Sequence, residues 1–231
     1  MIPKVITIQV GIIGTNCYLY HEKEDSSCWV IDPGGDADKI IQTLRDKRLT
    51  PKGILLTHTH FDHILGLTGL IKAYGKSIPV CVHVNGKSSL GKAGGERQKE
   101  VLSMMSPGLA AENSEILENL PEATHIFYAE ATTDKPEEVP DSTLSVIQTP
   151  GHAPESICFY SAEFGILFSG DTLFRQSIGR SDFQGGNSEE LLHSIGSKLY
   201  TLPEKTIVYP GHGGSTTIGY EKVHNPFITD N

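Results

Sequence analysis

A dense cluster of metal-ligating side chains constrains this sequence more than any other feature. Residues 57–63 read THTHFDH, so three histidines and one aspartate fall within six residues. The apolar segment just before them, Gly53–Leu56, predicts a short buried strand. Residues two apart in an extended segment point the same way, so His58 and His60 can share one ion. Asp62 and His63 begin a predicted helix and can turn toward a second ion, so we expect a metal site here.

Three further residues stand in matching contexts, each beside a glycine and just beyond a predicted strand. They are His152, Asp171 and His212, which follow the predicted strands 143–148, 165–168 and 206–209. Ligands placed in this way would meet at one rim of the sheets. Together with the first cluster they make seven ligands, enough for two ions bridged by one carboxylate and a water.

The rest of the chain predicts two strand-rich halves, each followed by helices. Further strands are expected at 4–10, 16–20, 28–31, 78–84 and 156–160, and helices at 36–49, 62–74 and 188–199. Residues 85–140 interrupt this rhythm with a Gly/Lys loop at 86–95, helices near 96–105 and 112–120, and an acidic stretch at 130–141. We interpret this segment as an inserted helical flap, because it is too short to bury a core of its own. The prediction is one domain, residues 1–231, with two sheets packed together and helices outside.

Composition limits the partners. The chain has 231 residues and a formal net charge of −9, which disfavours nucleic acid as a partner. No apolar stretch approaches the ~20 residues that cross a bilayer, and the N-terminal residues do not read as a secretory signal. The four cysteines form no CxxC pair, so we expect buried thiols in a reducing compartment, the cytoplasm. We therefore expect a small-molecule substrate, with no nucleic acid and no membrane, and leave the oligomeric state open.

The seven-residue set resembles the metallo-β-lactamase superfamily, and within it the glyoxalase II-like hydrolases of the short bacterial branch. The resemblance runs from about Val5 to Phe227, apart from the flap. It implies a mixed α/β (α+β) fold, the four-layered αββα sandwich of that family. It also implies that one ion is held by His58, His60 and His152. The second ion would be held by Asp62, His63 and His212, with Asp171 as the bridge.

The resemblance also narrows the chemistry. Histidine and aspartate ligands favour borderline divalent metals, with zinc expected first and iron or manganese also compatible. A cysteine commonly occupies the place of Asp171 in the β-lactam-hydrolysing relatives, which makes antibiotic hydrolysis a weaker expectation. The chain finishes soon after Phe227, without the C-terminal helical extension that helps larger glyoxalase II enzymes to bind glutathione. Hydrolysis of a thioester such as S-lactoylglutathione is therefore expected, with the thiol carrier left open.

In this prediction Asp62 and Asp171 are the catalytic carboxylates, and Arg180 is the candidate substrate-binding residue. Arg180 lies in the segment GRSDF at 179–183, which resembles a family segment whose basic residue holds the thiol carrier. A purely structural contact between Arg180 and Asp182 explains the same residues equally well.

Two other functions remain open at this point. The first is an iron-dependent persulfide dioxygenase, a sister branch that shares the Gly-Arg-x-Asp-Phe segment and keeps one iron on His58, His152 and Asp171. The second is a non-catalytic, metal-stabilised binding protein that uses its flap for a partner. The seven-ligand set argues against that second alternative, because a structural site is usually closed and four-coordinate.

Overall fold

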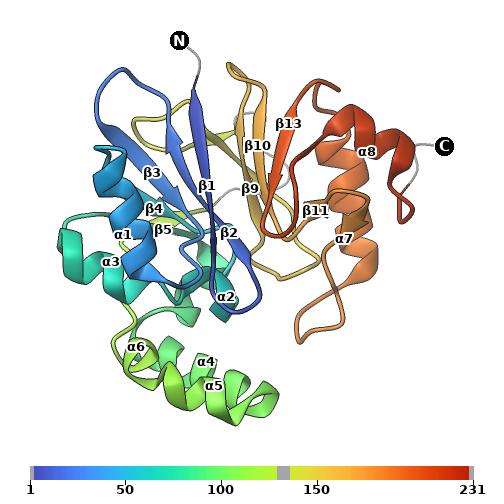
Figure 1. The fold of residues 1–231 in the computed structure, drawn as a ribbon. Coiled ribbons are helices and arrows are strands. Elements are labelled where there is room, and N and C mark those ends of the chain that lie inside the picture. Colours follow the sequence, from blue (N-terminus) through green and yellow to red (C-terminus); the bar gives the residue numbers. More distant parts are fainter. Residues whose placement is uncertain (1–2, 129–135, 229–231) are drawn as a thin grey trace. The chain divides into compact units, whose positions relative to one another are not determined.

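The computed structural model describes residues 3–128 and 136–228 of the chain. The backbone divides into two compact units, residues 1–126 and 127–231. Each unit contains one six-stranded sheet with its own helices (Figure 1). The prediction of a single domain stays a prediction.

The sheet of the first unit has the strand order β1-β2-β3-β4-β5-β6. β1 and β2 pair antiparallel, as do β2 and β3, whereas β3, β4 and β5 run parallel. The carboxyl ends of these three parallel strands therefore lie at one edge of the sheet, together with the β1–β2 turn. The strands are β1 Lys4–Val10, β2 Thr15–His21, β3 Ser27–Ile31, β4 Thr50–Leu55, β5 Val80–His83 and β6 His125–Phe127.

Two helices, α1 (Ala37–Asp46) and α3 (Leu67–Tyr74), pack against this sheet. Their apolar faces join the strand residues in one core, with Ile40, Leu44 and Leu70 fully buried. The expected amphipathic spacing of the first helix is confirmed. It ends at Asp46, a turn earlier than Leu49.

The predicted continuous helix over 62–74 is wrong. The structure has a short helix α2 (Phe61–Ile64) and a separate α3, with Gly66 between them. The Gly66 N–H donates to the Pro33 carbonyl at 2.7 Å, and a Cβ at Gly66 would lie 2.6 Å from that oxygen. The close approach of the Pro33 backbone thus breaks the helix just after the ligand-bearing turn.

The flap is helical, as predicted, but its glycine-rich start is no loop. It contains a 3₁₀ turn (Val84–Ser89) and the helices α4 (Gly91–Met105), α5 (Pro107–Glu112) and α6 (Ser114–Glu118). Gly95 lies inside α4, where a Cβ would meet the Leu117 carbonyl oxygen at 1.8 Å. The glycine therefore serves helix packing. Residues 129–135, which include the first part of the acidic stretch, lie outside the described residues.

The sheet of the second unit has the order β14-β13-β10-β9-β8-β7, and a separate hairpin pairs β11 with β12. Helix α7 (Ser188–Ser194), a π-helical turn (Ile195–Leu199) and α8 (Ile218–His224) supply side chains to its core. The hairpin and α8 were not predicted. The strands are β7 Glu137–Glu138, β8 Ser145–Gln148, β9 Ile157–Ser161, β10 Ile166–Gly170, β11 Leu173–Phe174, β12 Ser177–Ile178, β13 Ile207–Pro210 and β14 Thr216–Thr217.

Two composition-based expectations can be compared with the structure. All four cysteines are buried and carry free thiols, as predicted. Within the described ranges, no helix has the length and apolar character needed to cross a membrane.

Candidate metal centre

The first unit brings four of the predicted ligands together directly after β4. The His58 ring lies 4.7 Å from the His60 ring and 4.1 Å from the His63 ring, centroid to centroid. Ligand atoms of His58 also lie within 4.8 Å of those of His60 and of His63, and the same holds for Asp62 and His63. The loop after the strand therefore gathers its donors as the spacing predicted.

Asp32, which was not among the predicted site residues, organises this group. It follows β3 with a left-handed backbone (φ 48°), and its carboxylate accepts the Thr57 N–H at 2.8 Å and the Thr57 hydroxyl at 2.7 Å. The same carboxylate lies 3.0 Å from His63 Nδ1. Because β3 and β4 are parallel neighbours, the end of one strand can hold the loop that follows the other.

The Asp32 contact also fixes a proton on His58. The Thr57 hydroxyl gives its hydrogen to Asp32, so Thr57 Oγ1 must accept from His58 Nδ1, which lies 3.1 Å away. The lone pair of the His58 ring is then on Nε2. Such support from outside the ligand set is typical of metal-binding histidines.

Asp62 is held from the β1–β2 side of the sheet. The Thr15 hydroxyl, at the start of β2, donates to Asp62 Oδ2 at 3.0 Å. The same oxygen lies 3.3 Å from His63 Nε2. Both side chains are buried, and the Thr15 hydrogen bond holds the Asp62 carboxylate in place beside the His63 ring.

The second unit brings its three predicted ligands together as well. Asp171 Oδ2 lies 3.7 Å from His152 Nε2 and 3.5 Å from His212 Nε2. One carboxylate oxygen thus faces two imidazole nitrogens, each from a loop at the end of a different strand. This is the arrangement expected of a bridging carboxylate.

The segment after the β11–β12 hairpin positions these side chains. His152 Nδ1 donates to the Arg180 carbonyl oxygen at 2.6 Å, so the lone pair of this ring is also on Nε2. A Cβ at Gly179 would lie 1.8 Å from the Asp171 carbonyl oxygen, which shows how closely the two backbones approach. Phe174, on the hairpin, meets the His212 ring edge-on at 6.1 Å.

The geometry and the donor set fit divalent metal ions. Two ligands about 2.1 Å from one tetrahedral ion are about 3.4 Å apart. The carboxylate-to-imidazole separations in both units, 3.3, 3.5 and 3.7 Å, lie close to that value. All seven predicted ligands belong to groups of side chains that can hold a metal ion.

Arg180 pairs with a neighbour. Its Nε and one terminal nitrogen donate to the two oxygens of Asp182 at 2.9 and 2.8 Å, and its guanidinium lies 4.5 Å from the Phe183 ring centroid. The hydrogen bond from Arg180 lowers the pKa of the Asp182 carboxyl below its ordinary value. Both side chains are exposed, so the pair lies in contact with solvent. A role for Arg180 in substrate binding stays a prediction.

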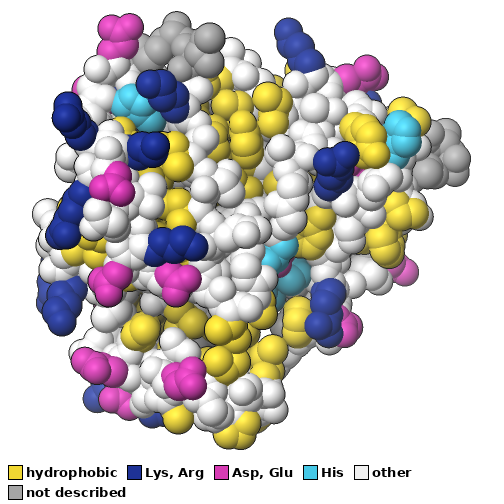
Figure 2. All heavy atoms as spheres, viewed as in Figure 1, with side chains coloured by type: hydrophobic (Ala, Val, Ile, Leu, Met, Phe, Trp, Pro, Cys, Tyr) yellow, Lys and Arg dark blue, Asp and Glu magenta, His cyan; other side chains and the backbone are white. Residues whose placement is uncertain are grey.

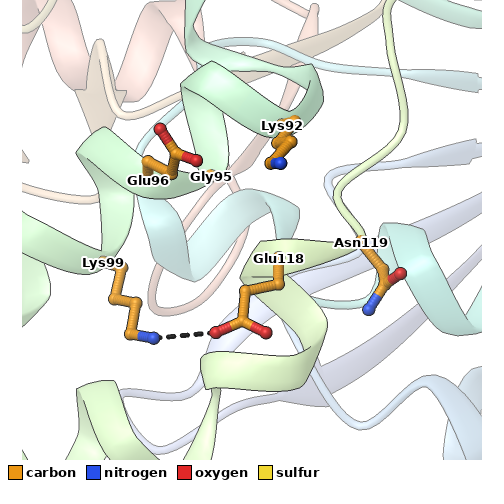
Figure 3. Close-up of a pocket in the computed structure, with 6 residues that line it drawn as sticks. All are labelled: Lys92, Gly95, Glu96, Lys99, Glu118 and Asn119. Carbon is orange, nitrogen blue, oxygen red and sulfur yellow. Dashed lines mark hydrogen bonds and ion pairs between the residues drawn. The ribbon is translucent and has the colours of Figure 1, made fainter.

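A separate cavity of about 540 Å³ lies in the flap and contains none of the predicted site residues. Figure 3 shows Lys99 of α4 reaching Glu118 of α6, with 2.9 Å between the charged atoms. The cavity is lined by Lys92, Gly95, Glu96, Lys99, Glu118 and Asn119. Two lysines and two glutamates give this lining no net charge.

Comparison with known proteins identifies the family. The sequence profile of the Metallo-beta-lactamase superfamily matches residues 10–212. The chain belongs to this superfamily. The expected metallo-β-lactamase fold is thereby confirmed, and the assignment supports a metal-binding hydrolase.

Curated relatives of this superfamily member cover almost its whole length. A probable metallo-hydrolase of Bacillus subtilis, YqgX, is 38% identical over 95% of this chain and 94% of its own. The hydroxyacylglutathione hydrolase GloC of Haemophilus influenzae is 31% identical and covers 96% of each chain.

Two solved structures share both the fold and part of the sequence. The BLEG-1 B3 metallo-β-lactamase is 39% identical, with a TM-score of 0.78 over 97% of this chain and 99% of its own. The di-iron-bound form of TTHA1623 is 30% identical, with a TM-score of 0.74 over 96% of this chain and 100% of its own. The first of these neighbours is named as a β-lactamase and the second as a di-iron-bound protein.

Proposed function

We propose that this protein is a dinuclear metal-dependent hydrolase that cleaves a thioester of the hydroxyacylglutathione type. The observation that carries the proposal is the Asp171 oxygen facing both His152 Nε2 and His212 Nε2, since a carboxylate placed in this way can bridge two ions. The similarity to GloC supports the thioester as the substrate class. Four buried thiols support a reducing compartment, the cytoplasm.

The ligand sets of the two units would hold the ions as the family resemblance implies, with zinc as the first choice and iron or manganese as alternatives. Two bound divalent ions would supply a water of near-neutral pKa and a positive charge for the departing thiolate. Water adds to the acyl carbon, the C–S bond breaks, and a carboxylic acid and a thiol leave.

The residues of this chain prepare that reaction. Thr15 holds the Asp62 carboxylate in one orientation, so Asp62 can orient the attacking water as well as bind metal. Asp171 lies at ligand spacing from both facing histidines. Arg180 would exchange Asp182 for a carboxylate of the substrate, since its fork of donors suits either.

The first experiment measures hydrolysis of S-D-lactoylglutathione by protein reconstituted with zinc, iron or manganese, with a β-lactam assayed in parallel. We expect kcat/KM of about 10⁴ M⁻¹s⁻¹ or more with at least one metal. Asp171→Ala should lose both the second ion, measured by elemental analysis, and thioester turnover. Asp25→Ala, at an exposed aspartate that accepts hydrogen bonds from Ser27 at the start of β3, is the matched control and should keep both the second ion and turnover.

Three results would overturn the proposal. The first is an active Asp171→Ala protein. The second is β-lactam turnover without thioester turnover, and the third is oxygen uptake with a glutathione persulfide, which would indicate the iron dioxygenase.

Arg180→Ala tests the substrate contact separately. We expect a higher KM for S-lactoylglutathione with kcat nearly unchanged, because binding away from the reacting atoms is lost. An unchanged KM would show that the Arg180–Asp182 pair is only structural.

A further inference from the structure

Exposed apolar side chains are distributed unevenly in the first unit. Among the described residues 3–126, every exposed large hydrophobic residue lies in the β1–β2 turn, directly after β5, or on α4. We call these residues the apolar rim: Ile12, Ile13, Val84, Val101, Met104 and Met105. Single exposed hydrophobics are ordinary, but a gathering of them at one place marks a binding surface.

The strand pairing places two parts of this rim at the edge of the sheet that carries the ligands. β4 leads into the ligand loop and runs parallel to β5, so Val84, which follows β5, lies at the same edge. The β1–β2 turn lies there too, because β2 is antiparallel to β3. The Thr15–Asp62 hydrogen bond confirms the proximity, since Ile13 is only two residues from Thr15.

Helix α4 brings the third part of the rim to the same loop. Gln98 Nε2 donates to the Thr59 carbonyl oxygen, between the two histidines of the loop, at 2.7 Å. Val101 and Met105 follow at i+3 and i+7, on the same face of the helix as Gln98. They are 49% and 58% exposed. An apolar strip therefore begins at the ligand loop and runs about 10 Å along the helix.

The base of this strip is packed and ordered. Leu102, Ala110 and Leu117 of the flap form a buried cluster. Phe61, the first residue of the ligand-bearing turn α2, and Leu65, which follows that turn, pack against this cluster. Figure 2 shows hydrophobic side chains gathered where α2 meets the flap helices. The exposed strip thus continues a cluster that already supports the ligands.

We propose that the apolar rim binds the acyl group of the substrate, so that the preferred thioesters carry an aliphatic or aromatic acyl group of several carbons. This inference rests on the proposed thioester hydrolysis and narrows its substrate class. The occupant is an acyl group because three separate segments of the rim lie beside the ligand loop. The main alternative occupant is a second copy of the chain, but a subunit interface does not require apolar residues to lie beside the ligand loop.

The expected selectivity is large. Each methylene that becomes buried improves binding about fourfold, so four extra methylenes raise kcat/KM by up to about 250-fold. The experiment compares S-lactoyl-, S-butanoyl- and S-octanoylglutathione on the metal-loaded protein. We expect the octanoyl ester to be preferred over the butanoyl ester by at least about tenfold.

Two variants test whether the chain-length preference comes from the apolar rim. Val101→Thr with Met105→Gln keeps side-chain volume and makes the strip polar, and should reduce the octanoyl-to-butanoyl ratio about tenfold. Val223→Thr, an equally conservative change at a 70% exposed valine of α8, is the matched control and should keep the ratio.

A binding measurement separates this inference from the proposed function. S-octylglutathione and S-butylglutathione are thioethers without the acyl carbon that water attacks in a thioester, so the proposed reaction leaves them intact. We expect the octyl compound to bind at least about tenfold more tightly than the butyl compound. Hydrolysis without chain-length preference overturns the inference and leaves the proposed function intact. Preferential binding of S-octylglutathione without thioester hydrolysis overturns the proposed function and leaves the apolar rim as a binding surface. A wild-type dimer that the double variant dissociates would make the rim a subunit interface and overturn the inference.

Discussion

Glu221 offers the sharpest test of how the second unit is held together. This glutamate of α8 is fully buried, and its carboxylate accepts three hydrogen bonds. The donors are the Thr216 hydroxyl at 2.5 Å, the Gln176 N–H at 2.8 Å and Asn225 Nδ2 at 3.0 Å. Asn225, which follows α8, also donates to the Ser177 carbonyl oxygen of β12, so the end of α8 is joined to the β11–β12 hairpin at two points.

The magnitude of a truncation follows from these contacts. In Glu221→Ala the Thr216 hydroxyl and one N–H of the Asn225 amide lose their acceptor, while the other Asn225 N–H keeps the Ser177 carbonyl. Each buried donor left without an acceptor costs about 1–3 kcal/mol. The Gln176 N–H is nearer the surface and can be hydrated. We therefore expect a loss of about 3 kcal/mol, or about 6–12 °C in Tm for a chain of this length.

Glu221→Gln is the conservative partner of this variant. Its amide oxygen can accept from the Gln176 N–H and from Asn225, while its NH₂ group donates to Thr216, whose hydroxyl can also accept. The expected loss is about 1 kcal/mol, because the hydrogen bonds are kept but the acceptor is neutral. Glu189→Ala, at an exposed glutamate of α7, is the surface control and should change stability by about 0.5 kcal/mol or less.

Thermal unfolding followed by circular dichroism in excess chelator is the assay, because chelation removes any contribution from bound metal. The reasoning is refuted if Glu221→Ala melts within about 2 °C of the wild type, or if Glu221→Gln is as damaging as the alanine variant. A second readout is metal affinity. The hairpin leads into Gly179 and the Arg180 carbonyl, so the alanine variant should also bind metal more weakly.

Two further predictions concern pH and metal binding. Burial raises the pKa of Cys28 and of Cys81 to about 12. The protonated thiols therefore contribute fully to stability below pH ~9, near the pKa of an unfolded thiol, and this contribution is lost as the pH rises toward 12. Urea unfolding at pH 8, 9.5 and 11 measures the loss. A free energy of unfolding that does not fall over this range contradicts the prediction. Asp32→Asn should weaken metal binding about 10–100-fold, measured by competition with a chelator, because Asp32 orients two ligand histidines. Unchanged affinity would contradict the role assigned to Asp32.

The candidate ligands could be identified from the sequence because their signal is local. His58, His152 and His212 each follow an apolar strand within a few residues, so strand pattern and ligand type are visible in one short window. The structure gathers them within their own units, together with both aspartates. The same local signal explains why most strands were placed within two or three residues of their observed bounds.

The supporting residues could not be predicted because their contacts join distant segments. Asp32 acts through Thr57, 25 residues away, and Glu221 through Gln176, 45 residues away. The break at Gly66 depends on the Pro33 carbonyl, and the helical Gly95 depends on the Leu117 carbonyl. Each of these features needs the pairing of strands or the packing of helices, which composition and periodicity do not contain.

The way in which His152 is supported bears on the substrate question. His63 and His58 depend on a side chain, Asp32, directly and through Thr57. His152 depends instead on the backbone carbonyl of Arg180. Replacing Arg180 with alanine keeps that carbonyl and removes only the guanidinium, so the metal ligand retains its support. A change in KM in Arg180→Ala with unchanged metal content therefore reports on the substrate alone, whereas a change at Asp32 reports on the metal site.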